Sequence, residues 1–156
     1  MSQFVRHLPV SNVLVDLALA SKKRVFEQVG LLFENQHGLS RAAVFDSLFA
    51  REKLGSTGLG QAVAIPHGRI KGLKDMLTAV IRLSEPIAFD APDGQPVKLL
   101  AVLLVPEQAA QIHLDCLSEL AQMLSDKAFR DRLMNAPDAQ ALHTALTQWD
   151  TVRSAA

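Results

Sequence analysis

The segment VKLLAVLLV, residues 97–105, is apolar at every position except Lys98. A short run that is apolar on both alternating faces is typical of a strand covered from both sides, as in sheets with helices packed against each face. Pro106 follows directly. Because proline has no backbone N–H to donate to a ladder, the strand is predicted to stop there.

Further strands and helices are predicted on either side of this segment. Residues 76–83 alternate with the period of a strand, residues 62–65 form a short apolar strand, and residues 13–17 are either a short strand or a loop. Pro86 and the segment 91–94 punctuate the connection to the central strand. Helices are predicted at about residues 22–35, 40–53, 108–124, 126–134 and 138–149.

Small polar residues and glycines mark the ends of the predicted helices. Ser21, Ser40 and Ser125 are expected to cap the N-termini of the first, second and fourth. Gly55 is expected to end the second in a left-handed conformation, and Pro137 is compatible with the start of the last. Strands interleaved with helices predict an α/β fold, with a sheet covered by helices on its faces. No repeat or linker-like tract interrupts the 156 residues, so one domain is expected.

Composition and charge exclude several function classes. The chain is 49 % hydrophobic and 21 % charged, with sixteen basic side chains balancing sixteen acidic ones. This balance argues against binding to nucleic acid or to an anionic membrane surface through a basic excess. The longest apolar run, Leu99–Val105, is too short to cross a bilayer, and the N-terminus lacks a signal-peptide pattern. Cys116 is the single cysteine and can form no internal disulfide, so a cytoplasmic protein is expected.

Residues with chemical potential are concentrated in the segment REKLGSTGLGQAVAIPHG, residues 51–68. Its glycine-rich part can turn backbone N–H groups inward and bind an anion such as phosphate, although an ordinary connecting loop is the alternative. A nucleotide-binding P-loop would need lysine and Ser/Thr after the last glycine, where Gln61 and Ala62 stand. The candidate anion-binding residues are Gly55, Ser56, Thr57, Gly58 and Gly60.

His67 stands between two residues that constrain the backbone in opposite ways. Pro66 fixes its own φ and keeps Ile65 extended, while Gly68 lets the chain leave in an unusual direction. The imidazole held between them is either a positioned nucleophile with one nitrogen facing the glycine loop or a surface histidine at a turn.

Two more polar residues share the apolar faces of predicted helices. Arg51 continues the stripe formed by Val44 and Leu48, and His113 shares the stripe of Leu117. Burying a cation or an imidazole without a partner is costly, so each side chain should be paired or should face a cleft. The alternatives are an arginine whose head reaches solvent at the rim of the core and a hydrogen-bonded histidine at the core edge.

Several of these segments together resemble the signature of one protein family. The stretches are REKLGSTGLG (51–60), AIPHG (64–68), PIAFD (86–90) and LLVP (103–106), followed by His113. They closely resemble the fructose/mannitol-type enzyme IIA domains of the bacterial phosphotransferase system, and among these the nitrogen-regulatory members. The resemblance covers most of the chain, with no recognisable signature in the first twenty residues or the C-terminal tail.

The resemblance implies a fold and a site. The family fold is an α/β sandwich with a mixed central β-sheet flanked by helices on both faces, which agrees with the elements predicted above. His67 matches the family's phosphorylated histidine, His113 a second histidine beside it, and Arg51 an arginine that lines the same site. The loop from Gly55 to Gly60 matches the loop around the phosphoryl group. The implied donor is a histidine phosphocarrier protein, itself phosphorylated by a phosphoenolpyruvate-dependent first enzyme.

These residue types suit phosphoryl transfer between histidines. Neutral imidazole is a good nucleophile near pH 7. Arg51 can donate two hydrogen bonds to phosphoryl oxygens, the hydroxyls of Ser56 and Thr57 can donate at lower charge, and a protonated His113 can add a charge-assisted bond. No cofactor is implied. The five histidines lack the spacing of a metal site, so no metal is expected.

Three functions remain open at this level. The resemblance favours a regulatory protein that takes up a phosphoryl group and thereby changes its binding to targets, which in the family include potassium transporters and sensor kinases. A sugar-specific IIA component that passes phosphate to a IIB domain is the alternative. The end of the chain at Ala156 without such a domain is expected to favour regulation. A non-catalytic binding module is disfavoured because Arg51, His67 and His113 are all present. Contact with the donor or closure of the core is expected of three apolar residues: Leu54, Leu59 and Ile70.

Overall fold

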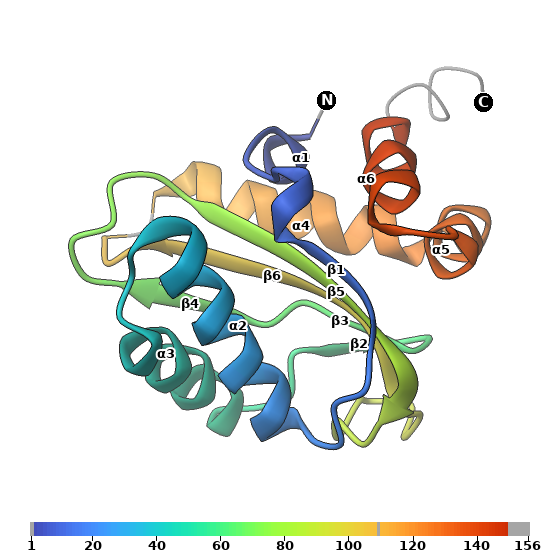
Figure 1. Ribbon diagram of the computed structural model, residues 1–156, viewed down its shortest axis with the longest axis horizontal. Helices are drawn as coiled ribbons and strands as arrows, with labels where there is room; N and C mark the ends of the chain where they lie inside the picture. The colour runs from blue at the N-terminus through green and yellow to red at the C-terminus, as the bar shows by residue number, and fades with distance from the viewer. Residues whose placement is uncertain (1, 109, 150–156) are drawn as a thin grey trace.

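A six-stranded mixed sheet runs through the computed structural model, which describes residues 2–108 and 110–149 (Figure 1). Its order is β1-β5-β6-β3-β2, with β4 also pairing with β6. β5 and β6 are antiparallel, whereas β1 runs parallel to β5, and β3 and β4 both run parallel to β6. The strands are β1 (Val13–Leu17), β2 (Gly58–Gly60), β3 (Val63–Ala64), β4 (His67–Ile70), β5 (Leu77–Ile87) and β6 (Val97–Pro106).

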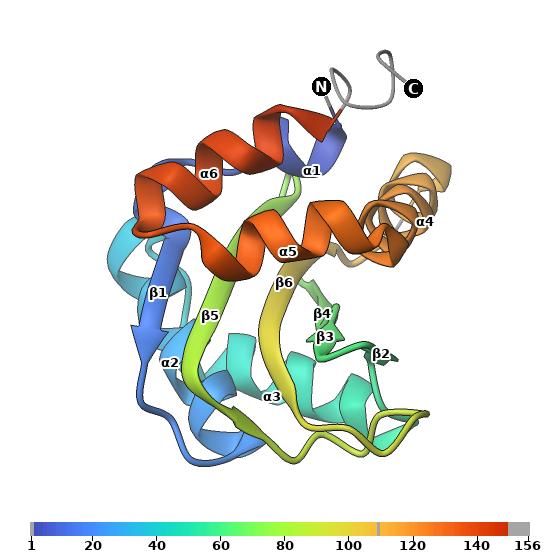
Figure 2. The same cartoon turned by 90° about the vertical axis from the view of Figure 1, so that its right-hand side faces the viewer.

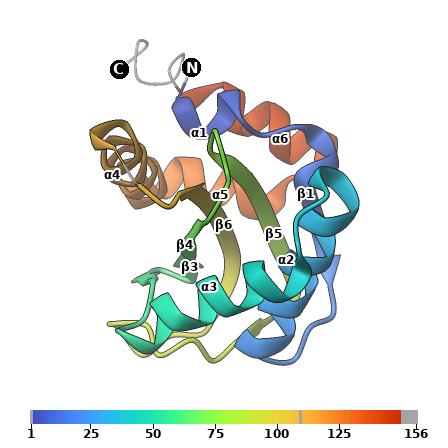
Figure 3. The same ribbon diagram turned by 90° about the vertical axis from the view of Figure 1, so that its left-hand side faces the viewer.

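Helices cover both faces of this sheet. Figure 3 shows α2 and α3 in front of the strands, and Figure 2 shows α5 and α6 in front of the opposite face with α4 beside them. The predicted α/β fold, a mixed central sheet flanked by helices on both faces, is therefore confirmed. The helices are α1 (Gln3–Arg6), a 3-10 turn (Val10–Asn12), α2 (Lys22–His37), α3 (Arg41–Lys53), α4 (Gln111–Ser125), α5 (Lys127–Asn135) and α6 (Ala139–Thr147).

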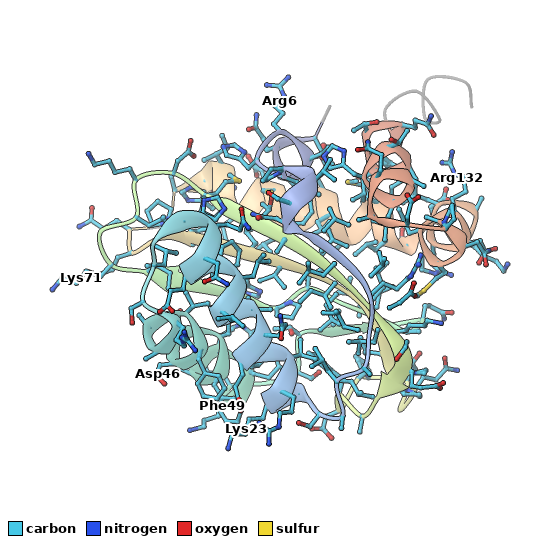
Figure 4. The ribbon with its side chains drawn as sticks, viewed as in Figure 1. Arg6, Lys23, Asp46, Phe49, Lys71 and Arg132 are labelled. Atoms are coloured by element: carbon cyan, nitrogen blue, oxygen red, sulfur yellow. The ribbon has the colours of Figure 1, made fainter. Side chains whose placement is uncertain are left out.

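The central strand β6 divides its side chains between two hydrophobic cores. Leu99, Ala101 and Leu103 pack with α1, α4, α5 and α6, whereas Leu100 and Val102 pack with α2 and α3. This alternation between two buried faces explains the apolar run of residues 99–105, because every one of these positions is buried. Figure 4 shows side chains filling the space between the layers, while the labelled side chains of Arg6, Lys71 and Arg132 point outwards.

The predicted helix ends are partly confirmed. Ser21 and Ser40 cap α2 and α3. The hydroxyl of each accepts a hydrogen bond of 3.2 Å from the backbone N–H three residues later. Ser125 was wrong as the cap of α5: it ends α4, and Asp126 takes the role with a bond of 2.8 Å from Phe129 N–H. Aspartate accepts such a bond with a full charge near the positive helix end.

Two other local predictions need correction. Gly55 is not the left-handed end of α3, because its φ is 155° and the helix closes through Leu54 in a right-handed conformation. β5 continues past the predicted end at Leu83 to Ile87 and passes through Pro86. The proline is accommodated because the pairing with β6 is irregular between Arg82 and Ile87.

His67 begins strand β4 (His67–Ile70), a strand that is not among the predicted elements. It pairs with Leu103 of β6, and α3 packs against the same strand. Ser47 of α3 donates its hydroxyl to the carbonyl of Arg69 at 2.8 Å. Gly68 permits this approach, because a Cβ there would collide with the Ser47 hydroxyl and lie 3.2 Å from the Ser47 Cβ.

Gly68→Ala is expected to destabilise the protein by about 1–3 kcal/mol, because α3 must move away from β4 to admit the methyl group. Chemical denaturation of the two proteins measures this difference. The double variant Ser47→Ala/Gly68→Ala should lose less stability than the sum of the two single changes, because the nearest colliding atom is gone. A Gly68→Ala protein as stable as the parent would contradict this account of the packing.

Candidate active site

Arg51, His67 and His113 meet at one cavity of about 420 Å³ between α3, β4, β6 and α4. They come from the last turn of α3, the first residue of β4 and the first turn of α4, so three separate elements deliver them. Most of the remaining lining is apolar: Ala50, Leu54, Leu103, Val105, Leu114 and Leu117. Arg51 and His113, the two polar residues that share apolar stripes in the sequence, therefore face a cleft, as their spacing predicts.

The ring of His67 is held in a single tautomer. Its Nδ1 lies 2.9 Å from the carbonyl oxygen of Ile65, which can only accept a hydrogen bond, so Nδ1 carries the proton. Nε2 therefore holds a lone pair, and it accepts from Nε–H of Arg51 at 3.3 Å. Both contacts require the same tautomer, in which Nε2 is the nitrogen with a lone pair.

The surroundings of His67 also favour its neutral form. Burial lowers the pKa of the imidazole below its ordinary value, and the nearby charge of Arg51 lowers it further. The hydrogen bond to the Ile65 carbonyl and the more distant charge of Glu52 oppose this shift without cancelling it. At neutral pH the ring is consequently uncharged, as a nucleophile must be.

We expect the imidazole of His67 to titrate below the ordinary value of 6.5 in the unmodified protein, because burial penalises the protonated ring. An NMR titration of the ring signals measures the midpoint directly. Arg51→Met removes a positive charge and should move the midpoint upward, although not fully back, since burial is the larger cause. A midpoint at or above 6.5 in the unmodified protein would contradict the assignment.

Arg51 uses two edges of its guanidinium group at once. Nη1 donates to the carbonyl of Gly55 at 2.9 Å, and Nε donates to His67 Nε2. The first bond fixes the side chain against the loop that follows α3, and the second aims it at the lone pair of the histidine. Arg51 is half-buried, and two hydrogen bonds within the protein hold its guanidinium group at the edge of the cavity.

His113 is also fixed in one tautomer, by the start of its own helix. The backbone N–H of Ala110 donates to its Nδ1 at 2.9 Å, so the ring proton is on Nε2. In a capping box, the side chain of the third helical residue accepts a hydrogen bond from the backbone N–H of the cap residue. Here Nδ1 of His113 is the acceptor, in the place usually taken by a glutamate carboxylate. In this arrangement the neutral ring supplies a donor at Nε2, whereas the charge-assisted bond of a protonated His113 would require loss of the bond from Ala110.

The glycine-rich loop turns its donors away from the cavity. Ser56 donates its hydroxyl to the carbonyl of Phe89 at 2.7 Å, and Thr57 donates its hydroxyl to Glu52 at 2.7 Å. The backbone N–H groups of Gly55, Thr57 and Gly58 are also engaged within the protein. In this conformation neither hydroxyl is free to donate to an anion. The loop contacts the cavity-lining residues through the bond between the Gly55 carbonyl and Arg51.

The glycines of the loop have packing roles. A Cβ on Gly58 would lie 2.9 Å from the Cβ of Ala91, and one on Gly60 would lie 3.1 Å from the carboxylate of Asp93. Gly60 also has a φ of +87°, which a side chain rarely adopts. Both glycines therefore let the segment around residues 91–93 approach the loop.

The structure adds residues to the site that the sequence analysis did not single out. Ser47, Arg69 and Leu114 line the cavity. Ser47 precedes Arg51 by one helical turn, and Arg69 follows His67 by one strand period. Residues at these spacings share a face with the predicted residue, so Ser47 and Arg69 could have been found in the sequence by counting from Arg51 and His67. Of the apolar residues considered for donor contact, Leu54 lines the cavity and is 85 % exposed, whereas Ile70 is buried in the core.

Metal ligands, the cysteine thiol and membrane-spanning helices were also considered for residues 2–108 and 110–149. No group of three or more His, Cys, Asp or Glu side chains in that part of the chain is placed to hold a metal ion. Burial raises the pKa of the Cys116 thiol to about 11, so this side chain is protonated and a poor nucleophile. Within the same residues, no helix has the length and apolar character needed to cross a membrane.

This fold and site define a component of the phosphotransferase system. Residues 6–149 match the family described as the phosphoenolpyruvate-dependent sugar phosphotransferase system, EIIA 2, and the chain belongs to that family. It is 48 % identical over 131 residues to the nitrogen regulatory protein of Pseudomonas aeruginosa, which covers 83 % of this chain and 85 % of that relative.

Solved structures give the same family and fold. The nitrogen regulatory protein IIA-Ntr from Neisseria meningitidis matches with a TM-score of 0.88 and 52 % identity, over 93 % of this chain and 99 % of that one. The IIA mannitol protein from Escherichia coli matches with a TM-score of 0.74 over 89 % of this chain and 98 % of that one. At 21 % identity, the second likeness concerns the fold alone. The chain is thus a phosphotransferase-system IIA protein that resembles the nitrogen-regulatory members.

Proposed function

We propose that this protein is a nitrogen-regulatory IIA phosphocarrier that accepts a phosphoryl group on Nε2 of His67 from a histidine phosphocarrier protein. The observation that carries the proposal is the tautomer of His67, which places the lone pair on Nε2 at a cavity lined by Arg51 and His113. In its two states the protein would bind target proteins differently. Potassium transporters and sensor kinases are the target classes that the family resemblance suggests.

The transfer needs no proton to leave His67. The lone pair of Nε2 forms a new P–N bond while the P–N bond to the donor histidine breaks and its electron pair returns to the donor ring. Nδ1 keeps its proton and its hydrogen bond to the Ile65 carbonyl throughout. Such transfer depends on an in-line approach and on donors around the moving phosphoryl oxygens, with little covalent work by the protein.

Two side chains are placed to meet the charge of the phosphoryl group. Arg51 lies against the attacking nitrogen and can turn its guanidinium toward the oxygens, where it offers planar paired donors. His113 presents its Nε2–H on the same cavity, because its other nitrogen is occupied by Ala110. His113 is held before the group arrives, whereas Arg51 would exchange its bond to Nε2 for bonds to the phosphoryl oxygens, so reorganisation during transfer is confined to one side chain.

Intact-mass spectrometry tests this proposal most directly. The protein would be incubated with phosphoenolpyruvate, the first enzyme and the histidine phosphocarrier, and then measured before and after mild acid treatment. One added phosphoryl group that acid removes is the expected result, because phosphohistidine is labile in acid. No added mass with a donor that phosphorylates another IIA protein would overturn the proposal.

A second candidate function has a specific relative in its favour. The fructose-specific EIIA component of Haloferax volcanii is 35 % identical over 108 residues, covering 69 % of this chain and 70 % of that protein. If this chain served sugar uptake, its phosphorylated form would pass the group rapidly to a IIB domain. Retention of the phosphoryl group in the presence of such domains is expected for the regulatory function and would exclude this alternative.

A further inference from the structure

Next to Arg51, outside the lining of the cavity, lies a buried ion pair to which the transfer chemistry gives no role. Glu52 follows Arg51 at the end of α3, and its side chain is only 5 % exposed. Lys22, at the start of α2, donates to Oε1 of Glu52 at 2.8 Å and lies 4.3 Å from the ring centre of Phe89. A carboxylate buried so deeply must satisfy its remaining oxygen sites with further donors.

Thr57 supplies two of those donors, its backbone N–H and its hydroxyl. Its backbone N–H donates to Oε1 of Glu52 at 3.0 Å, and its hydroxyl donates to Oε2 at 2.7 Å. Thr57 is itself 4 % exposed, so bulk solvent has little access to these bonds. The carboxylate therefore fixes both the backbone and the side chain of Thr57.

Two branches lead from Thr57 to the reacting groups. In the first, the carbonyl of Thr57 accepts from Ile65 N–H at 3.0 Å, and the carbonyl of Ile65 in turn accepts from Nδ1 of His67 at 2.9 Å. In the second, Thr57 lies two residues after Gly55, whose carbonyl holds Nη1 of Arg51. Thr57 is thus connected to His67 through Ile65 and to Arg51 through Gly55.

We propose that Glu52 and Thr57 are positioning residues that hold His67 Nε2 and Arg51 Nε in register for phosphoryl transfer, acting through Ile65 and Gly55 without contacting the phosphoryl group. The proposal rests on the function proposed for His67. Its physical basis is that an imidazole stays in one tautomer only while its Nδ1–H acceptor stays in place. A shift of Thr57 moves that acceptor, because Ile65 N–H is bonded to it.

The test uses the near-isosteric change Thr57→Val, which removes one donor to Glu52 and keeps the shape of the side chain. The rate constant of phosphoryl uptake should fall about 10- to 100-fold, the loss expected from a small misplacement of reacting groups, with little change in KM for the phosphocarrier. Thr57→Ser keeps the hydroxyl and should restore the rate. Should Thr57→Val not fold, Glu52→Asp withdraws the carboxylate by one methylene and is expected to act in the same direction.

A second readout requires no phosphoryl transfer. Nitrogen-15 spectra of the imidazoles, taken well above the pKa of His67, distinguish the Nδ1–H tautomer from the Nε2–H tautomer. The parent protein and Thr57→Val should differ, with the variant showing a mixture of tautomers at His67. If the parent takes up no phosphate, the proposed function fails, and this measurement still decides whether Thr57 positions the ring.

A matched control separates positioning from general loss of stability. Thr78 of β5 is also fully buried, and its hydroxyl donates to the carbonyl of Phe4, away from the loop, at 3.2 Å. Thr78→Val should lower stability and leave both the transfer rate and the His67 tautomer unchanged. The proposal would be overturned if Thr57→Val changed neither the rate constant of phosphoryl uptake nor the tautomer of His67. It would also be overturned if Thr78→Val changed both to the same extent as Thr57→Val.

Discussion

His67→Asn is expected to abolish phosphoryl uptake while the protein remains folded. The amide N–H of asparagine can replace Nδ1–H as a donor to the Ile65 carbonyl, so the local backbone contact can survive. The change removes Nε2, the atom whose lone pair attacks phosphorus. Because no neighbouring group can take its place as a nitrogen nucleophile without a new tautomer or geometry, the effect should be complete and not partial.

Intact mass after incubation with the donor system checks this expectation. His143→Gln is a suitable control, because His143 bonds the carbonyl of Leu8 through Nε2 and does not line the cavity. The glutamine amide can keep that bond, so full uptake is expected. Phosphoryl uptake by the His67→Asn protein on another histidine would show that the nucleophile has been assigned to the wrong residue.

Arg51→Ala is expected to slow transfer strongly without abolishing it. A preorganised donor at a site of developing charge is typically worth about 2–4 kcal/mol, which corresponds to a rate loss of roughly 30- to 1,000-fold. The transfer rate of Arg51→Lys should lie between those of the parent and Arg51→Ala, because lysine keeps the charge but not the planar arrangement of donors. His67 keeps its lone pair in both variants, so residual transfer is expected.

Single-turnover uptake from the phosphorylated donor measures this effect apart from docking. Arg6→Ala is a matched control, because Arg6 points outward from α1, as Figure 4 shows, and does not line the cavity. Its rate should equal that of the parent. Transfer at the parental rate by Arg51→Ala would mean that the guanidinium serves the loop through Gly55 and has no part in the reaction.

The layered fold could be predicted because its determinants are local patterns. The apolar run of β6 requires two covered faces, and Ser21 and Ser40 act as caps through neighbours three residues away. The three polar residues of the site could be chosen because each interrupts a pattern: Arg51 and His113 occupy apolar stripes, and His67 stands between two constraining residues. Interruption of a strong pattern is visible without coordinates.

The role of the loop could not be predicted, because a sequence does not say which partner a hydroxyl selects. Ser56 and Thr57 look like free donors until the positions of Phe89 and Glu52 are known. Strand β4 was missed for a similar reason. Its four residues carry too little pattern of their own, and pairing with β6 together with the approach of Ser47 to Gly68 defines it.

The apolar rim of the cavity has a consequence for how its state can be read. Leu54 is 85 % exposed and Leu114 is 55 % exposed, and both border the cavity that holds His67. Around a neutral imidazole, such a rim sheds its hydration readily, and a partner gains from covering it. A phosphoryl dianion at the same place would hold its hydration shell tightly and make drying of the rim costly. The hydration of this small apolar patch would then distinguish the two states.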